Sequence, residues 1–89
     1  MNNNTLPQAH TRTKVRLDRP EDAEKFVKLL NSDGSTDKFI LENFDGSFKV
    51  DARSVLGVIY ASVEWAGETY LVNTSRDGVY PAGIREFYI

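Results

Sequence analysis

The chain of 89 residues has no cysteine, only one histidine, and no long apolar run. Without cysteine there is no disulfide framework, no thiolate metal site and no thiol redox chemistry. One histidine alone cannot build a zinc site of the usual composition. No apolar run approaches the roughly 18 residues of a membrane-spanning helix. We therefore expect a protein that binds no metal and no cofactor and does not enter a membrane.

The chain also lacks a large excess of positive or negative charge. Eleven basic residues stand against thirteen acidic ones, which gives a net charge of −2. The only basic concentration is Lys14, Arg16 and Arg19, and it is small. A nucleic-acid-binding protein usually carries a larger basic stripe. The composition therefore does not favour a nucleic-acid partner, and the small basic group fits a solvated strand edge better than a site for a phosphate or an acidic partner.

The first ten residues, MNNNTLPQAH, are polar and aperiodic. They lack the charged n-region and apolar h-region of a signal peptide, so we expect a disordered leader and a cytoplasmic protein. Apolar residues make up 40% of the chain, an ordinary fraction for a globular protein. We expect residues 11–89 to form a single domain.

Periodic patterns predict the first two elements. Residues 11–17 alternate, with Val15 and Leu17 on one face, which is typical of a half-buried strand. Pro20 suits the first position of a helix, because proline lacks the N–H that a first helical turn leaves unpaired. Apolar residues then recur at helical spacing and predict an amphipathic helix: Ala23, Phe26, Val27 and Leu30.

The second half predicts a hairpin, a helix and a strand. Asp45-Gly46 is a turn signal between short strands at 39–43 and 48–51. A shorter helix at 55–63 and a strand at 68–73 follow, and residues 79–89 fit either a short helix or a strand. The order β-α-β-β-α-β favours an α+β open-faced sandwich, with a four-stranded antiparallel sheet and helices on one face.

This pattern resembles HPr, the histidine-containing phosphocarrier family of the bacterial sugar phosphotransferase system. The match is carried by the stretch Leu41-Glu42, Asp45-Gly46 and Val50-Asp51-Ala52-Arg53-Ser54-Val55-Leu56-Gly57, and by residues 68–72. The family shows a similar strand, glycine turn, basic residue, serine, aliphatic pair and glycine. The C-terminal segment departs from the family, whose last element is a long amphipathic helix, because it is short and contains proline and glycine.

The active loop of the family carries a His-x-Arg-Pro signature, which corresponds here to Leu17-Asp18-Arg19-Pro20. Leucine stands at the histidine position, and an ungapped match to the helix places Arg19 there instead. Neither side chain is a nucleophile that changes protonation near neutral pH. The resemblance therefore implies a degenerate member that cannot carry phosphohistidine.

Ser54 has two readings. In Gram-positive relatives the serine at this position is phosphorylated by a dedicated kinase, and the modified protein binds a transcriptional regulator. Serine is also a favoured helix N-cap whether or not it is modified. The resemblance further implies that Arg19, Arg53, Val55, Leu56 and Ile59 bind protein partners, with Leu56 the most exposed of the aliphatic residues. The aliphatic ones could instead pack in the core.

We therefore expect a non-enzymatic, HPr-like regulatory or protein-interaction domain, regulated at Ser54. Its partners would be an HPr kinase, a transcriptional regulator or other phosphotransferase components. The competing hypothesis is a working phosphocarrier with another phosphoacceptor, such as His10, whose His10-Thr11-Arg12 partly matches the signature. A third possibility is a module that shares the fold and uses neither phosphosite.

Overall fold

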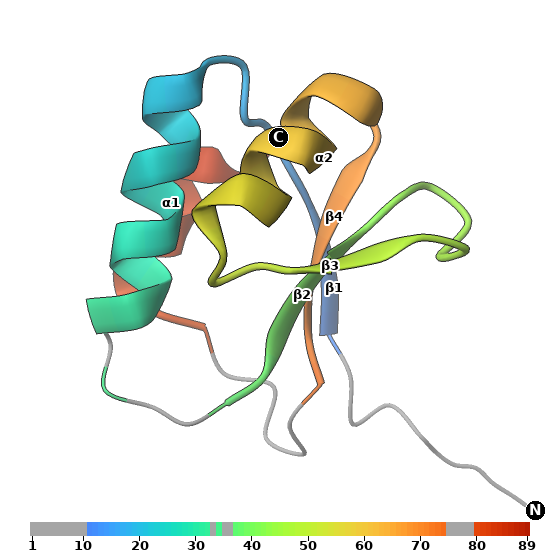
Figure 1. The fold of residues 1–89 in the computed structure, drawn as a ribbon. Helices are drawn as coiled ribbons and strands as arrows, with labels where there is room; N and C mark the ends of the chain where they lie inside the picture. The colour runs from blue at the N-terminus through green and yellow to red at the C-terminus, as the bar shows by residue number, and fades with distance from the viewer. Residues whose placement is uncertain (1–10, 33, 35–36, 75–79) are drawn as a thin grey trace, which may run out of the picture.

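The computed structural model describes residues 11–32, 34, 37–74 and 80–89 (Figure 1). The described elements follow the predicted order β-α-β-β-α-β and end with a 3₁₀ helix. They are β1 (Thr11–Val15), α1 (Pro20–Ser32), β2 (Phe39–Glu42), β3 (Lys49–Asp51), α2 (Val55–Glu64), β4 (Thr69–Asn73) and η2 (Ala82–Phe87). The predicted leader, residues 1–10, lies outside the described residues.

The four strands form one sheet in the order β1-β4-β2-β3, and all neighbouring strands are antiparallel. The first strand therefore pairs with the last, so the sheet is complete only when strands from both halves of the chain have come together. Val15 lies opposite Thr69, and Leu41 lies opposite both Leu71 and Val50. The predicted α+β architecture with a four-stranded antiparallel sheet is confirmed.

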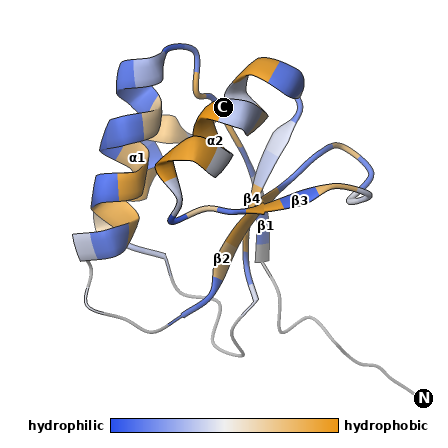
Figure 2. Cartoon of the chain, viewed as in Figure 1, coloured by the Kyte–Doolittle hydropathy of each residue, from blue (hydrophilic) through white to orange (hydrophobic). Residues whose placement is uncertain are grey.

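Both α-helices cover the same face of the sheet (Figure 1). Helix α1 buries the four residues whose spacing predicted it, and its other positions are largely hydrophilic (Figure 2). From the sheet, Val15, Phe39, Leu41 and Leu71 point into the same core, each at most 1% exposed. Among the described residues, no helix combines the length and apolar character needed to cross a membrane.

The C-terminal segment combines the two structures that its sequence allowed. Helix η2 buries Ile84 and Phe87, and the next residue, Tyr88, forms an isolated bridge with Val15 of β1. The ring of Phe87 meets the edge of the Phe26 ring at 5.2 Å between centroids. This short element fills the core beside α1, where aromatic contacts stabilise the packing.

Strand β1 ends two residues earlier than the alternation predicted. Beyond Val15, the N–H of Arg16 donates to the carbonyl of Phe87 at 2.8 Å, so the chain pairs with the C-terminal segment and not with β4. Leu17 still points inward and is 5% exposed. The alternation of buried and exposed side chains therefore continues through Leu17, beyond the residues of β1 that pair with β4.

Gly57 lies inside α2, although glycine weakens a helix by about 1 kcal/mol relative to alanine. A Cβ at this position would lie 3.2 Å from the carbonyl oxygen of Asp51 and 3.4 Å from the Cβ of Val50. Glycine therefore allows the first turn of α2 to lie directly on the end of β3. A larger residue at position 57 would have to displace this backbone contact.

Candidate functional site

Ser54 caps the N-terminus of α2. Its backbone is extended, and its hydroxyl accepts a hydrogen bond from the N–H of Gly57 at 3.2 Å. Its carbonyl accepts from the N–H of Val58 at 2.9 Å, which begins the helical ladder. The cap predicted from sequence is confirmed, and it satisfies one of the N–H groups that a first helical turn leaves without an intrahelical partner.

Helix α2 has no carboxylate in its first turn, whereas α1 has Glu21 and Asp22 there. The positive end of the α2 dipole is therefore not offset by the helix's own side chains. A phosphate on Ser54 would lie where N–H groups and the dipole both favour an anion. The chemistry of this end is compatible with both readings of the serine.

Ser54→Ala is expected to lower the free energy of unfolding by about 1 kcal/mol, because the Gly57 N–H loses its acceptor. For a domain of this size, that corresponds to a melting temperature about 4–8 °C lower. Thermal unfolding followed by circular dichroism measures the change. Ser54→Asp keeps a capping oxygen and is expected to melt close to the wild type, and an equal loss in both variants would contradict the capping role.

Arg53 turns its guanidinium away from Ser54. It donates to the carbonyl of Leu30 at 2.7 Å and to the carbonyl of Asp37 at 2.8 Å, and it lies over the ring of Phe39. The Arg53 carbonyl in turn accepts from the side chain of Asn31 at 3.3 Å. The basic residue beside the serine thus joins the end of α1 to the start of α2.

The outer face of α2 is apolar. Leu56 is 80% exposed, which confirms the sequence prediction that it is the most exposed of the three aliphatic residues. Val55 is also exposed, and Ile59 is half-buried against the core. Tyr60 and Val63 extend the exposed apolar stripe toward the end of the helix. Sequence reasoning did not single out Tyr60 or Val63 as surface residues, although their spacing from Leu56 is helical.

Leu17, at the position aligned with the family's histidine, belongs to the hydrophobic core. It is 5% exposed, and an apolar side chain there is not available to a partner protein. Asp18 is exposed, and its carboxylate lies 3.9 Å from the guanidinium of Arg16. Leu17 and Asp18 therefore offer no imidazole that a phosphate donor could reach.

Arg19 lies directly before α1, at the position where a cap residue stands. Its carbonyl accepts from the N–H of Asp22 at 2.9 Å and from that of Ala23 at 3.3 Å. The Asp22 carboxylate accepts from the N–H of Arg19 at 3.2 Å and lies 3.7 Å from its guanidinium. Arg19 is exposed, so the start of α1 presents a cation to the surface.

The starts of the two helices lie at opposite ends of the sheet. Val15, from which the chain leaves toward α1, is opposite Thr69 at the start of β4. Asp51, from which it leaves toward α2, is opposite Ile40, which in turn is opposite Val72 near the end of β4 (Figure 1). Arg19 therefore does not join Ser54 in one patch.

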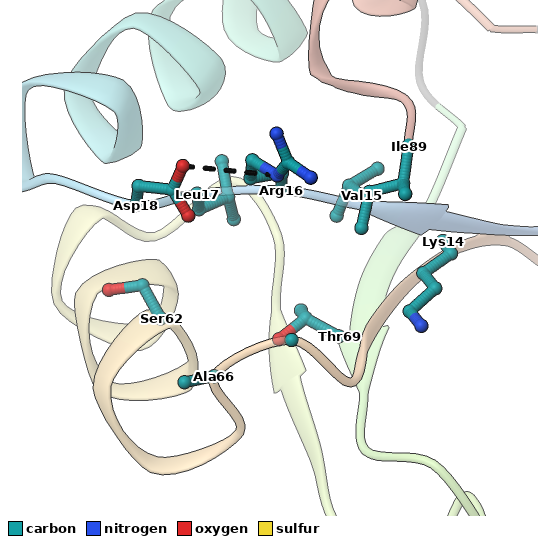
Figure 3. A pocket seen from close by; sticks show the side chains of 10 residues that line it. Lys14, Val15, Arg16, Leu17, Asp18, Ser62, Ala66, Thr69 and Ile89 are labelled. Atoms are coloured by element: carbon teal, nitrogen blue, oxygen red, sulfur yellow. Dashed lines mark ion pairs between the residues drawn. The ribbon is translucent and has the colours of Figure 1, made fainter.

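A cavity of about 290 Å³ separates the β1–α1 connection from the end of α2. Leu17 and Asp18 line one side, and Ser62 and Thr69 line the other (Figure 3). Both hydroxyls donate to backbone carbonyls, Ser62 to Ile59 at 2.8 Å and Thr69 to Trp65 at 3.0 Å. Each hydroxyl has one proton, so neither has one left for a ligand.

Within the part of the chain that the structure describes, no group of three or more histidine, cysteine or acidic residues could hold a metal ion. The single histidine, His10, lies outside the described residues. No family model, no curated protein and no solved structure matches this chain.

Proposed function

We propose that this chain is an HPr-like regulatory or protein-interaction domain of the cytoplasm, related to the sugar phosphotransferase system and unable to carry phosphohistidine. The observation that carries the proposal is the state of the two positions aligned with the family's nucleophile. Leu17 is buried in the core, and Arg19 is an exposed cation at the start of α1. Leucine has no nucleophilic atom, and arginine stays protonated at physiological pH.

The proposed partner-binding surface is the outer face of α2, with Ser54 at its start. Val55 and Leu56 are exposed there, and Ile59 is half-buried beside them. An apolar stripe on a rigid helix is typical of protein-interaction sites, since its burial stabilises a complex without first ordering a loop. Arg53 supports this surface by holding the start of the helix in place.

Regulation at Ser54 is supported by the absence of a carboxylate from the first turn of α2 and by the exposed apolar residues next to it. Phosphorylation would add a charge of about −2 at the edge of the partner-binding surface. The Arg53 guanidinium already binds two carbonyls, so it is not the group that would hold this phosphate. Within the chain, the N–H groups of the first turn of α2 would accommodate the charge instead. A basic partner would then bind the modified face in preference to the unmodified one.

Incubation with a bifunctional HPr kinase and ATP is expected to add one phosphate to the wild type. Ser54→Ala is expected to gain none, and it remains folded because the lost cap costs only about 1 kcal/mol. Intact-mass measurement detects the product, and peptide mapping assigns the residue. An unmodified wild type under conditions that phosphorylate an authentic HPr would contradict regulation at Ser54.

Phosphoenolpyruvate and the general phosphotransferase enzyme are expected to leave the protein unmodified, because no described residue offers a reactive imidazole. An acid-labile phosphate on the wild type would overturn the proposal in favour of a working phosphocarrier. His10→Ala would then identify the acceptor, since His10 is the only histidine in the chain.

A further inference from the structure

A second cavity, of about 330 Å³, lies between the β2–β3 hairpin and the end of α2. Its lining combines two aromatic rings with two carboxylates. The lining residues are Asn43, Phe44, Glu64, Trp65, Ala66 and Glu68. Neither Ser54 nor the aliphatic residues at the start of α2 contribute to it.

The aromatic part of the cavity is partly open and partly fixed. Phe44 is 64% exposed, whereas Trp65 is 9% exposed and packs edge-on against Tyr60. Among the described residues, none accepts a hydrogen bond from the indole N–H of Trp65. A buried tryptophan N–H usually has an acceptor, so a ligand that brings a carbonyl to this ring would complement it.

The carboxylates of the cavity are not fully offset by ion pairs. Glu64 is exposed and makes no ion pair with any residue that the structure describes. Glu68 accepts from the hydroxyl of Tyr70 at 3.2 Å and lies 3.3 Å from the ammonium of Lys14. Beside ring faces, these carboxylates favour a cationic ligand with a flat or flexible apolar body.

The backbone that carries Phe44 is held in place before any ligand binds. The guanidinium of Arg12 donates to the carbonyls of Phe44 at 2.8 Å and Asn43 at 3.2 Å, while it also pairs with Glu42 at 2.6 Å. Hydrogen bonds from the side chain and the N–H of Ser47 tighten the turn and lower the pKa of Asp45. A preorganised wall loses little conformational freedom on binding.

We propose that this cavity binds an arginine side chain of a protein partner. The guanidinium plane would stack on Phe44, its N–H fork would donate to Glu64 and Glu68, and a backbone carbonyl of the same segment would accept from the Trp65 indole. A peptide supplies both a cation and a carbonyl, which the mixed lining requires. An anionic membrane or nucleic acid would instead meet the two carboxylates.

Trp65 is the only tryptophan of the chain, so intrinsic fluorescence reports on the cavity directly. An acetylated, amidated pentapeptide with a central arginine is titrated into the unphosphorylated protein. We expect a saturable change in emission that weakens with added salt. The same peptide with citrulline, which keeps the shape and loses the charge, is expected to bind about tenfold more weakly. Equal binding of both peptides would overturn the proposal.

Two substitutions test the lining. Phe44→Ala and Glu64→Gln are each expected to weaken binding by about three- to tenfold. Phe48→Ala is the matched control for the first, because Phe48 is 62% exposed in the same hairpin and does not line the cavity. Glu24→Gln, on the exposed face of α1, is the control for the second.

Equal losses of peptide affinity from Phe48→Ala and Phe44→Ala would indicate nonspecific apolar binding to the hairpin. Unchanged peptide affinity in Glu64→Gln would show that the Glu64 carboxylate does not contact the peptide. Either result overturns the proposal. Since Glu64 is exposed, Glu64→Gln keeps the test valid even where Phe44→Ala disturbs the hairpin. The kinase experiment on Ser54 involves neither the peptide nor the cavity, so the two proposals fail independently.

Discussion

Arg53→Gln is expected to lower the free energy of unfolding by about 2–4 kcal/mol, because two charge-assisted hydrogen bonds are lost. The guanidinium donates to the carbonyls of Leu30 and Asp37, at 2.7 and 2.8 Å, in a partly buried setting. Both carbonyls would be left short of donors at the junction of α1, β2 and α2. Urea unfolding followed by circular dichroism measures the loss.

Arg53→Lys is the informative control for this prediction. Lysine keeps the charge but cannot fork between two carbonyls, so we expect about half of the loss. Lys49→Gln controls for the removal of a surface cation, since Lys49 is exposed and its pairing with Glu42 is of the weak surface kind. A loss for Arg53→Gln no larger than that for Lys49→Gln would contradict the structural role of Arg53.

Sequence adjacency suggested the wrong neighbour for Arg53. Its position next to Ser54 suggested a cation beside the proposed phosphorylation site, whereas its side chain reaches residues 16 and 23 positions away. Which of several carbonyls a long, flexible side chain finds depends on how α1 and β2 pack. No local pattern encodes that packing, so the sequence could not predict the contact.

The elements themselves were predictable because each one depends on local chemistry. The spacing of Ala23, Phe26, Val27 and Leu30 located the buried face of α1, and Pro20 located its start. Gly46, whose φ is 76°, marked the hairpin that it forms. Ser54 marked the start of α2 because its hydroxyl accepts the hydrogen bond of a backbone N–H that lacks a partner within the helix.

The surface around α2 was less predictable, because apolar residues at helical spacing normally indicate a buried face. Only Val58 and Ala61 of this helix are buried, and the apolar residues Leu56, Tyr60 and Val63 are exposed. The exposure of Phe44 was equally hard to predict from the sequence, because its backbone carbonyl is bound by Arg12, 32 residues away in the chain. Long-range packing, and not local propensity, decides which apolar residues reach the surface.

Leu17→His is expected to lower the free energy of unfolding by about 3 kcal/mol or more. The substitution removes an apolar side chain from the core and buries an imidazole without a prepared hydrogen-bond partner. A small domain has a total stability of about 5–10 kcal/mol, so the variant would lose a large part of it. Leu17→Met, which nearly conserves volume, is expected to cost less than about 1.5 kcal/mol. Thermal and urea unfolding measure both.

Arg19→His is the contrasting variant, and we expect it to unfold within about 0.5 kcal/mol of the wild type. The Arg19 side chain is 70% exposed, and its ion pair with Asp22 is a surface contact. The carbonyl of Arg19, which accepts the first helical hydrogen bonds, is unchanged by the substitution. An equal loss from both variants would contradict this contrast. Of positions 17 and 19, only position 19 can therefore hold an exposed imidazole without loss of core packing.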